Sequence, residues 1–327
     1  MTALPHRAPR WLLTAALLAL VATLVPSAPA HAADAAAHEA RFVDSLNVER
    51  ASRGLDRVRV AADLTAVARR HSDVMAAQSR LHHNPNLASD VSGWQRLSEN
   101  VGRGPSVASI HSALMASTGH RANILDTRVT EVGVGVTVSG STIWVTQVFR
   151  LPTTVQSATY RDVGGTHASS IARLADAGIT TGCTASRYCP HREVTRAQMG
   201  TFLARSAVLM PSSSSPFRDL HRAPVHEHNV SALADAGVTG GCTDTRFCPN
   251  RTVTRGQMAT FLANARGLSP VAGSRFTDVP ADAVHAGTIN AIADAGITRG
   301  CGDGRFCPDE PLTRAEMASF LVRAFNL

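Results

Sequence analysis

The stretch that decides the fold of the second half of the chain is IARLADAGITTGCTASRYCPHREVTRAQMGTFLA, residues 171–204. It recurs as VSALADAGVTGGCTDTRFCPNRTVTRGQMATFLA at 230–263 and as INAIADAGITRGCGDGRFCPDEPLTRAEMASFLV at 289–322. Each copy begins 59 residues after the one before it. A fixed period of this kind is typical of an internal repeat. The sequence therefore predicts three copies of one structural unit.

Each copy has the same internal plan. A short helix is predicted to end at a glycine, as a left-handed C-cap requires: Gly178, Gly237 and Gly296. A loop with two cysteines follows, and then a second helix. A Thr three residues before a Gln or Glu opens that helix, which is the pattern of a capping box. One such unit has little core of its own, so we expect the three to pack together.

The six cysteines all lie in these repeats, two in each copy. They are Cys183, Cys189, Cys242, Cys248, Cys301 and Cys307. An even number at regular spacing in an exported protein predicts disulfides, and pairing within each copy closes a short loop. Other pairings remain open at this point. A zinc site built from cysteine and nearby histidine is the rival interpretation.

The N-terminus predicts export. Residues 1–32 combine a basic start, an apolar run at 11–25 and the small-residue sequence AHA at 30–32. This combination is typical of a cleaved signal peptide, and the alternative is a membrane anchor. No later stretch of the sequence is long and apolar enough to span a membrane, so we expect no transmembrane segment after cleavage.

Length and composition narrow the class of protein further. The 327 residues are enough for two or more domains, and 44% are hydrophobic. The net charge is +7 and every strong cation is an arginine, since the chain has no lysine. This mild excess favours an anionic partner. The aromatic content of 5% argues against stacked single-strand binding, so no nucleic-acid partner is predicted.

The first half has a different pattern. Apolar residues at helical spacing predict helices around 41–54, 62–78 and 106–117. Residues 132–138 then alternate valine with small residues, and 143–149 return after a turn, which predicts a β-hairpin. Gly133 and Gly135 oppose the valines and would allow a neighbouring element to approach closely. Helices followed by strands predict a layered α/β domain.

Residues 158–327 resemble S-layer homology repeats. The resemblance rests on the starts YRDV, FRDL and FTDV, on the GIT or GVT turn, and on TRAQ, TRGQ and TRAE. It implies a mainly helical three-repeat module, with units at 158–208, 216–267 and 275–327, that attaches to anionic cell-wall polysaccharide. The family's tryptophan in the first helix is not matched, and His167, His226 and His285 lie nearby instead. The cysteine pairs are an addition.

Residues 38–152 resemble the CAP superfamily, also called SCP-like extracellular domains, and 153–157 would be a linker. The resemblance rests on LHHNPN at 81–86, SENVG at 98–102, TGHRANIL at 118–125 and VGVGV at 132–136. It implies an α-β-α sandwich with a cleft lined by histidines and glutamates. His83, Glu99 and His120 match three of these positions, with His82 as an alternative for the first. The second glutamate has no counterpart, and its region holds His111 and Ser112.

Two imidazoles and a carboxylate suit zinc or another divalent metal, and they equally suit acid–base chemistry. Alternatively, His120 and Glu99 hold loops and have no ligand. Neither a serine nor a cysteine has a recognisable nucleophile setting, so a binding role for this cleft is favoured over an enzyme. His71 lies on an apolar helical face and is expected to be a core histidine, with His82 exposed.

One arginine directly follows the capping Thr of each repeat, where the partial charge of the helix N-terminus disfavours a cation. These are Arg196, Arg255 and Arg314. We expect each to form an anion site with the free backbone N–H groups, and alanine in its place to leave the helices folded. The alternatives are a solvated side chain or an ion pair with the aspartate that opens the repeat: Asp162, Asp219 or Asp278.

The fold class expected for the chain is α/β, a CAP-type α-β-α sandwich followed by a mainly helical three-repeat module. The sequence thus predicts an extracellular protein of the cell wall or S-layer. Its repeats would attach to wall polymer, and its CAP-type cleft would bind an unknown ligand or a metal. A metal-dependent envelope hydrolase with Glu99 as base, and a purely structural wall component, are the alternatives.

Overall fold

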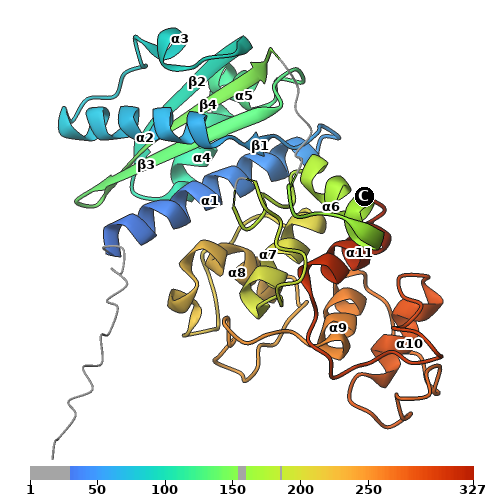
Figure 1. The fold of residues 1–327 in the computed structure, drawn as a ribbon. Coiled ribbons are helices and arrows are strands. Elements are labelled where there is room, and N and C mark those ends of the chain that lie inside the picture. Colours follow the sequence, from blue (N-terminus) through green and yellow to red (C-terminus); the bar gives the residue numbers. More distant parts are fainter. Residues whose placement is uncertain (1–29, 154–159, 185) are drawn as a thin grey trace, which may run out of the picture.

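The computed structural model describes residues 30–153, 160–184 and 186–327 (Figure 1). Most of the predicted signal peptide (1–32) and of the predicted linker (153–157) lies outside these residues. The chain forms a mixed α/β part followed by a helical part (Figure 1). Among the described residues, no helix has the length and hydropathy needed to cross a membrane.

The N-terminal part has five helices and four strands within the described residues. In chain order they are α1 (Ala30–Ala51), β1 (Arg59–Val60), α2 (Ala62–Ala77), α3 (Leu87–Asp90), β2 (Trp94–Gly104), α4 (Val107–Ala116), α5 (Thr118–Ile124), β3 (Glu131–Ser139) and β4 (Thr142–Pro152).

The four strands form one sheet in the order β1-β3-β4-β2. β3 and β4 are the predicted hairpin, and β1 pairs with β3 in parallel. β2 pairs antiparallel with β4 and is an outer strand. The sequence did not predict β2, because its residues WQRLSENVGRG lack a clean apolar–polar alternation.

Helices cover both faces of this sheet (Figure 1). The valines of β3 share one core with α1, α4 and α5, while α2 packs on the opposite face. A Cβ on Gly133 would come within 2.2 Å of the backbone of Leu64, and one on Gly135 within 2.1 Å of the backbone of Arg69. These two glycines therefore let α2 lie directly on β3, and the predicted α-β-α sandwich is confirmed.

The C-terminal part contains three copies of a two-helix unit. Repeat 1 has η1 (Gly165–His167), α6 (Ala168–Asp176) and α7 (Arg196–Ser206). Repeat 2 has η2 (Leu220–Arg222), η3 (Pro224–His226), α8 (Glu227–Asp235) and α9 (Arg255–Ala265). Repeat 3 has α10 (Ala286–Asp294) and α11 (Arg314–Phe325).

The three repeats close into a ring through backbone hydrogen bonds. Val253 N–H donates to the carbonyl of Val194, Leu312 N–H to that of Val253, and Val194 N–H to that of Leu312, over 3.0, 2.8 and 2.9 Å. The last bond returns from repeat 1 to repeat 3, so the arrangement has no free end. The units consequently stand around an approximate three-fold axis.

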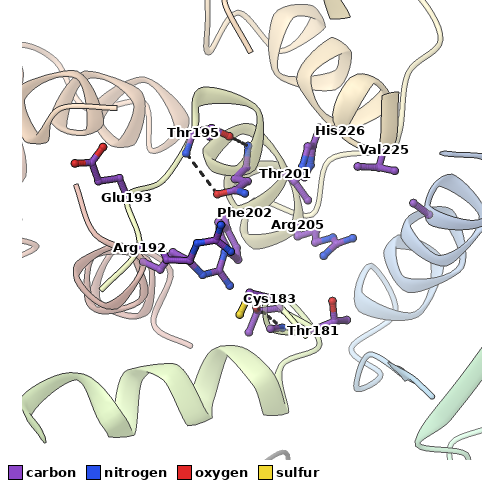
Figure 2. Close-up of a pocket in the computed structure, with 15 residues that line it drawn as sticks. Thr181, Cys183, Arg192, Glu193, Thr195, Thr201, Phe202, Arg205, Val225 and His226 are labelled. Carbon is purple, nitrogen blue, oxygen red and sulfur yellow. Dashed lines mark hydrogen bonds between the residues drawn. The ribbon is translucent and has the colours of Figure 1, made fainter. Parts of the chain in front are cut away.

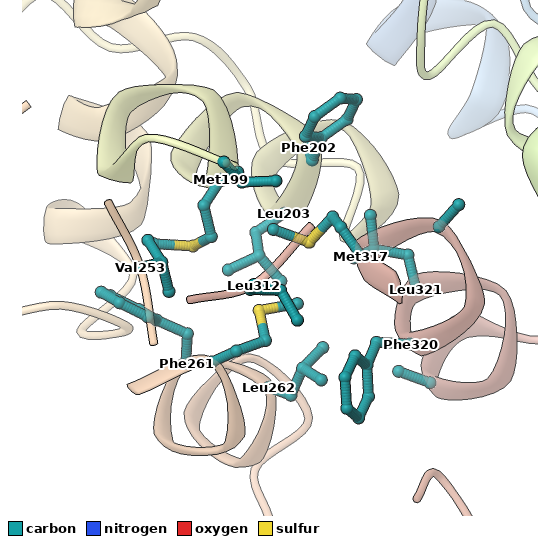
Figure 3. Packing of buried hydrophobic residues seen from close by; sticks show 14 of the residues in the cluster. Met199, Phe202, Leu203, Val253, Phe261, Leu262, Leu312, Met317, Phe320 and Leu321 are labelled. Atoms are coloured by element: carbon teal, nitrogen blue, oxygen red, sulfur yellow. The ribbon is translucent and has the colours of Figure 1, made fainter. Parts of the chain in front are cut away.

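The second helices of the repeats supply a common core around this axis (Figure 3). Met199 and Met317 enter this core from α7 and α11 (Figure 3), and they and Met258 are fully buried. One hydrophobic cluster includes residues of all three repeats. The expectation that the units share a core is therefore confirmed.

The predicted disulfides are also confirmed. Each repeat pairs its own two cysteines, Cys183 with Cys189, Cys242 with Cys248, and Cys301 with Cys307. A cluster of Asp278 with the last cysteine pair has the spacing of a metal site, but both sulfurs are committed to the disulfide. The zinc interpretation of the cysteines is thus wrong for this pair and for the other two.

Helix α1 connects the two parts by docking on repeats 1 and 2 (Figure 1). Its Asp44 is buried, with a carboxylate that accepts hydrogen bonds from Arg205 Nε at 2.7 Å, His228 Nε2 at 2.7 Å and Asn229 Nδ2 at 2.9 Å. Arg205 belongs to α7, and the other two donors belong to α8. The other repeats do not carry this set of three residues at the corresponding positions, which explains why α1 docks at this pair of repeats.

Candidate functional site

The histidine and glutamate of the predicted cleft are in direct contact. His83, in the loop after α2, lies with Nδ1 2.7 Å from Glu99 Oε1 on β2. The same oxygen accepts a hydrogen bond from the backbone N–H of Asn84 at 3.0 Å. The Glu99 side chain is 4% exposed, and its other oxygen, Oε2, is buried without a partner among the described residues. One carboxylate oxygen thus fixes His83 and the other is unused.

His120 is held beside the same strand by two asparagines. Asn100 on β2 donates from Nδ2 to the carbonyl of His120 at 3.1 Å. Asn123, also on α5, donates from Nδ2 to the carbonyl of Glu99 at 3.2 Å and to Asn100 Oδ1 at 2.9 Å. The TGHRANI segment is therefore a helix tied to β2, and this contact fixes the position of His120.

The two histidines reach this place from opposite layers of the sandwich. The loop that carries His83 follows α2, whereas α5 packs on the other face of the sheet. Because β2 is an outer strand, both can approach at its edge. Burial lowers the pKa of His120, and the charge of His83 lowers it further.

Three other histidines of this part, His71, His82 and His111, have partners other than Glu99. The His82 ring stacks edge-on against His71, and its Nε2 contacts Gln78 Oε1 at 3.1 Å, so the side chain is half-buried where exposure was expected. His71 is a core histidine, as predicted, and contacts the carbonyl of His82 at 2.8 Å. His111, from the region of the missing glutamate, is buried on α4 with Nε2 3.8 Å from Glu49 Oε1 on α1.

The hydrogen bonding of the His83–Glu99 pair defines what it can do. A neutral His83 that donates its Nδ1 proton to Glu99 carries a lone pair on Nε2. The His83 side chain is 62% exposed, so this nitrogen can reach a ligand from solvent. A carboxylate that orients an imidazole in this way is the usual support of a metal-binding histidine. The group can therefore bind a cation or move a proton.

The three predicted polymer-binding arginines are inside the ring of repeats. Arg196, Arg255 and Arg314 are 6%, 4% and 5% exposed. Each donates from Nε to a backbone carbonyl of the following repeat, at 2.7, 2.9 and 2.8 Å. Each guanidinium also lies over two aromatic rings, at 4.6 to 5.5 Å from their centroids.

The burial of these arginines argues against the expectation that alanine in their place leaves the repeats equally stable. A solvated side chain does not describe them, and alanine in their place would remove a bond between repeats and two ring contacts. We now expect such variants to destabilise the repeats, by about 1–3 kcal/mol for each arginine. The position at the helix N-terminus, which looked unfavourable in the sequence, is explained by this packing between repeats.

The three aspartates brace the disulfide loops, and the alternative ion pairs with the arginines are not formed among the described residues. In each repeat one carboxylate oxygen accepts from the backbone N–H of an aromatic residue, and the other from that of the next cysteine, at 2.7 to 2.9 Å. They are Asp162, Asp219 and Asp278. Burial opposes ionisation of these carboxylates, but the backbone donors hold their pKa below the ordinary value.

A cavity of about 450 Å³ lies over repeat 1 (Figure 2). Repeat 1 supplies most of its lining, including Arg192 and Gln198. Arg314 comes from repeat 3, His226 from repeat 2 and Ala40 from α1 of the first domain. We call this cavity groove 1. The sequence did not single it out, because its residues come from four separate segments of the chain.

The fold therefore combines an α-β-α sandwich, with a histidine–glutamate pair at a sheet edge, and a closed ring of three helical repeats that each contain one disulfide. Family models give the same division. The CAP model, described as the cysteine-rich secretory protein family, matches residues 43–149. The S-layer homology domain model matches 159–199, 222–259 and 275–318. The chain thus carries a CAP domain followed by three S-layer homology repeats.

Curated relatives match part of the chain. A surface-layer 125 kDa protein of Lysinibacillus sphaericus is 35% identical over 126 residues, which are 38% of this chain and 11% of that protein. A cell surface protein of Thermoanaerobacter kivui is 31% identical over 121 residues, which are 35% of this chain and 16% of that protein. The chain therefore spans a small fraction of the length of these relatives. The repeats and these relatives indicate an extracellular, cell-wall-associated protein.

Solved structures match a similar share of the chain. An extracellular protein with an SCP domain from Bacillus anthracis is 24% identical, with a TM-score of 0.32, over 36% of this chain and 41% of that one. A cysteine-rich secretory protein from Staphylococcus aureus is 20% identical, with a TM-score of 0.31, over 36% of this chain and 39% of that one.

Proposed function

We propose that this surface-anchored envelope protein attaches to anionic cell-wall polysaccharide through the grooves of its repeats, and that its CAP domain offers a ligand-binding cleft. The observation that carries the attachment is groove 1. Its lining combines Arg192 and Arg314 with the amide of Gln198. Arg314 Nη2 is buried without a partner among the described residues.

An anionic group is the ligand that such a lining favours. A buried guanidinium nitrogen with no acceptor is costly, and a carboxylate or phosphate oxygen would satisfy it with a charge-assisted hydrogen bond. Glu193 also lines the groove, but its carboxylate points away from the side chains of Arg192 and Phe202 (Figure 2). The groove therefore has a net attraction for negative charge.

Co-sedimentation of the intact protein with purified walls of the producing bacterium tests the attachment. We expect binding at low ionic strength that weakens as sodium chloride is raised, because the arginines at the groove opening are screened. Absence of the protein from the wall pellet at low salt would contradict the proposal. Binding that is unchanged up to molar salt would contradict its electrostatic basis.

For the cleft, we propose that His83 and His120 bind a divalent metal such as zinc, with Glu99 orienting His83. Support comes from the His83–Glu99 contact and from the unpartnered Glu99 Oε2, which fit a bound cation or its water. Burial lowers the pKa of His120, which favours the neutral imidazole that a metal ligand requires. A bound metal would supply a positive charge at which an anionic or carbonyl ligand could dock.

Calorimetric titration of the intact protein with zinc tests the cleft. We expect one site whose affinity falls as the pH drops below about 6.5, because protonated imidazole cannot bind metal. His83→Asn should remove this binding, whereas His82→Asn should leave it in place, because His82 faces His71 and Gln78. Equal effects of the two variants would contradict the assignment.

The envelope hydrolase remains a second candidate because Glu99 Oε2 is free to accept a proton. In that case turnover on a peptide or glycan library should be lost in Glu99→Gln, a variant that keeps the shape of the side chain. Turnover that survives this change would exclude Glu99 as the base. Zinc binding without turnover would leave the cleft as a binding site.

A further inference from the structure

A second cavity lies in the CAP domain, between helix α2 and the loop that follows it, and has a volume of about 660 Å³. Cavities of this size commonly hold a small molecule. His83, whose Nδ1 contacts Glu99, forms part of its wall. The cavity therefore adjoins the histidine–glutamate pair, and we call it the α2 pocket.

The α2 pocket has apolar surface on both sides. Val67 and Val74 belong to the part of α2 that lines it, and Pro85 lines it from the loop. A spacing of seven residues places the two valines on one side of the helix. Val67 is buried, whereas Val74 is 42% exposed. An apolar group that enters the pocket would remove the surface of Val74 from water, which is favourable.

Two arginines at the α2 pocket have no counter-ion. Arg70 on α2 and Arg80 in the loop both line the pocket and are exposed. Neither takes part in any of the ion pairs formed within residues 30–153, 160–184 and 186–327. Their neighbour Arg69 shows the contrast, because it donates to both carboxylate oxygens of Glu39. The two pocket arginines are thus available to a ligand.

One acidic residue lines the α2 pocket, and it does not balance these two cations. Asp90 already accepts a hydrogen bond on Oδ2 from Asn84 Nδ2 at 2.9 Å. One carboxylate against two guanidinium groups leaves an excess of positive charge in the lining. Because the pocket is concave and partly apolar, this charge is screened less than it would be on a flat surface.

We propose that the α2 pocket binds a small anion with an apolar body, such as the carboxylate of an apolar dipeptide. The apolar body would cover Val74, and the anionic group would pair with Arg70 and Arg80. Both arginines lie outside the proposed metal-binding set, so this site needs no metal. The inference gives a chemical class to the ligand of the CAP domain, and it rests on the proposal that this domain binds one.

Two fluorescent probes with the same apolar body test the inference. Anilinonaphthalene sulfonate carries one anionic group, and phenylnaphthylamine has the same rings without it. Fluorescence titration of the intact protein in the presence of EDTA, which removes bound metal, gives the affinity for each probe. The variants are Arg70→Ala combined with Arg80→Ala, and Val74→Asn. Arg173→Ala, at an exposed position of α6 outside the pocket, is the matched control.

We expect the arginine double variant to bind the sulfonate probe about tenfold more weakly, because two ion pairs are lost. Its affinity for the neutral probe should stay that of the parent, since the apolar surface is unchanged. Val74→Asn should weaken the binding of both probes. Acetylated divaline should displace the sulfonate probe, whereas inorganic phosphate at the same concentration should not, because phosphate has no apolar body.

The inference is overturned if the double variant binds the sulfonate probe as tightly as the parent does, or if Arg173→Ala weakens this binding equally. Displacement by phosphate as effective as that by divaline would also overturn it, and so would a parent protein that binds neither probe. Failure of the zinc titration or of wall co-sedimentation would instead contradict the proposed function, and it would leave these affinities unchanged.

Discussion

Replacing Asp44 by alanine should separate the two domains. The carboxylate of Asp44 accepts from Arg205, His228 and Asn229 and is 3% exposed. Burial alone would raise its pKa, but Arg205 and His228 hold that pKa well below the ordinary value. Removing it leaves the guanidinium of Arg205 and the buried side chains of His228 and Asn229 without their common acceptor. Breaking a buried ion pair of this kind costs about 3–5 kcal/mol.

This energy acts on the contact between α1 and the repeats, where it corresponds to a loss of about two to four orders of magnitude in the docking equilibrium. Scanning calorimetry of the intact protein is the assay. We expect the parent to unfold in one transition and Asp44→Ala to unfold in two, with the lower one several degrees below that of the parent. Asp235→Ala, an exposed residue of α8, is the matched control.

A second variant separates the ion pair from general damage. His228→Ala combined with Asp44→Ala should cost less than the sum of the two single changes, because the pair is lost only once. Strictly additive effects, or an Asp44→Ala transition that matches the Asp235→Ala control, would refute the reasoning.

Three further outcomes follow from particular contacts. Gly135→Ala should destabilise the CAP domain by about 1–3 kcal/mol or more in urea unfolding, because the added Cβ meets the backbone of α2 at 2.1 Å, whereas Gly119→Ala, with open space around it, should not. Burial lowers the pKa of His226 to about 4, so the folded state binds this proton less readily than the unfolded state. The stability of the protein should therefore fall as the pH drops from about 6.5 to 4. His226→Gln should flatten that part of the profile of stability against pH, and His191→Gln, at an exposed position, should leave it unchanged. Thiol titration of the unreduced protein should find no free thiol, and reduction should lower the stability of the repeats, which carry all six cysteines. Six reactive thiols would contradict the observed pairing.

The regular features of the fold could be predicted because each depends on local sequence. The period of 59 residues is visible when the three copies are aligned. The glycines after the first helices and the threonine caps act on backbone groups within a few residues of themselves. The close approach at Gly133 and Gly135 was also visible, since glycines that alternate with valines in a strand leave one face without side chains. These predictions required no knowledge of contacts between distant segments.

The features that the sequence did not predict depend on contacts between distant segments. The buried environment of Arg314 is formed by Tyr188, from a repeat 126 residues away in the chain. Asp44 meets its partners across a separation of 161 residues or more. The difference between Gln198 and Glu316 was readable from the aligned repeats. The contact of Glu316 with Arg255 of the preceding repeat is formed only in the folded ring, so the sequence alone does not show it.

The central claim is that the repeats hold the protein to the polysaccharide of the wall, and it can be tested by changing the wall instead of the protein. Co-sedimentation would compare purified walls with the same walls after chemical extraction of their polysaccharide, which leaves the peptidoglycan. We expect the protein to pellet with the intact walls and to stay in solution with the extracted ones. Equal binding to both would show that peptidoglycan is the ligand and would contradict the account.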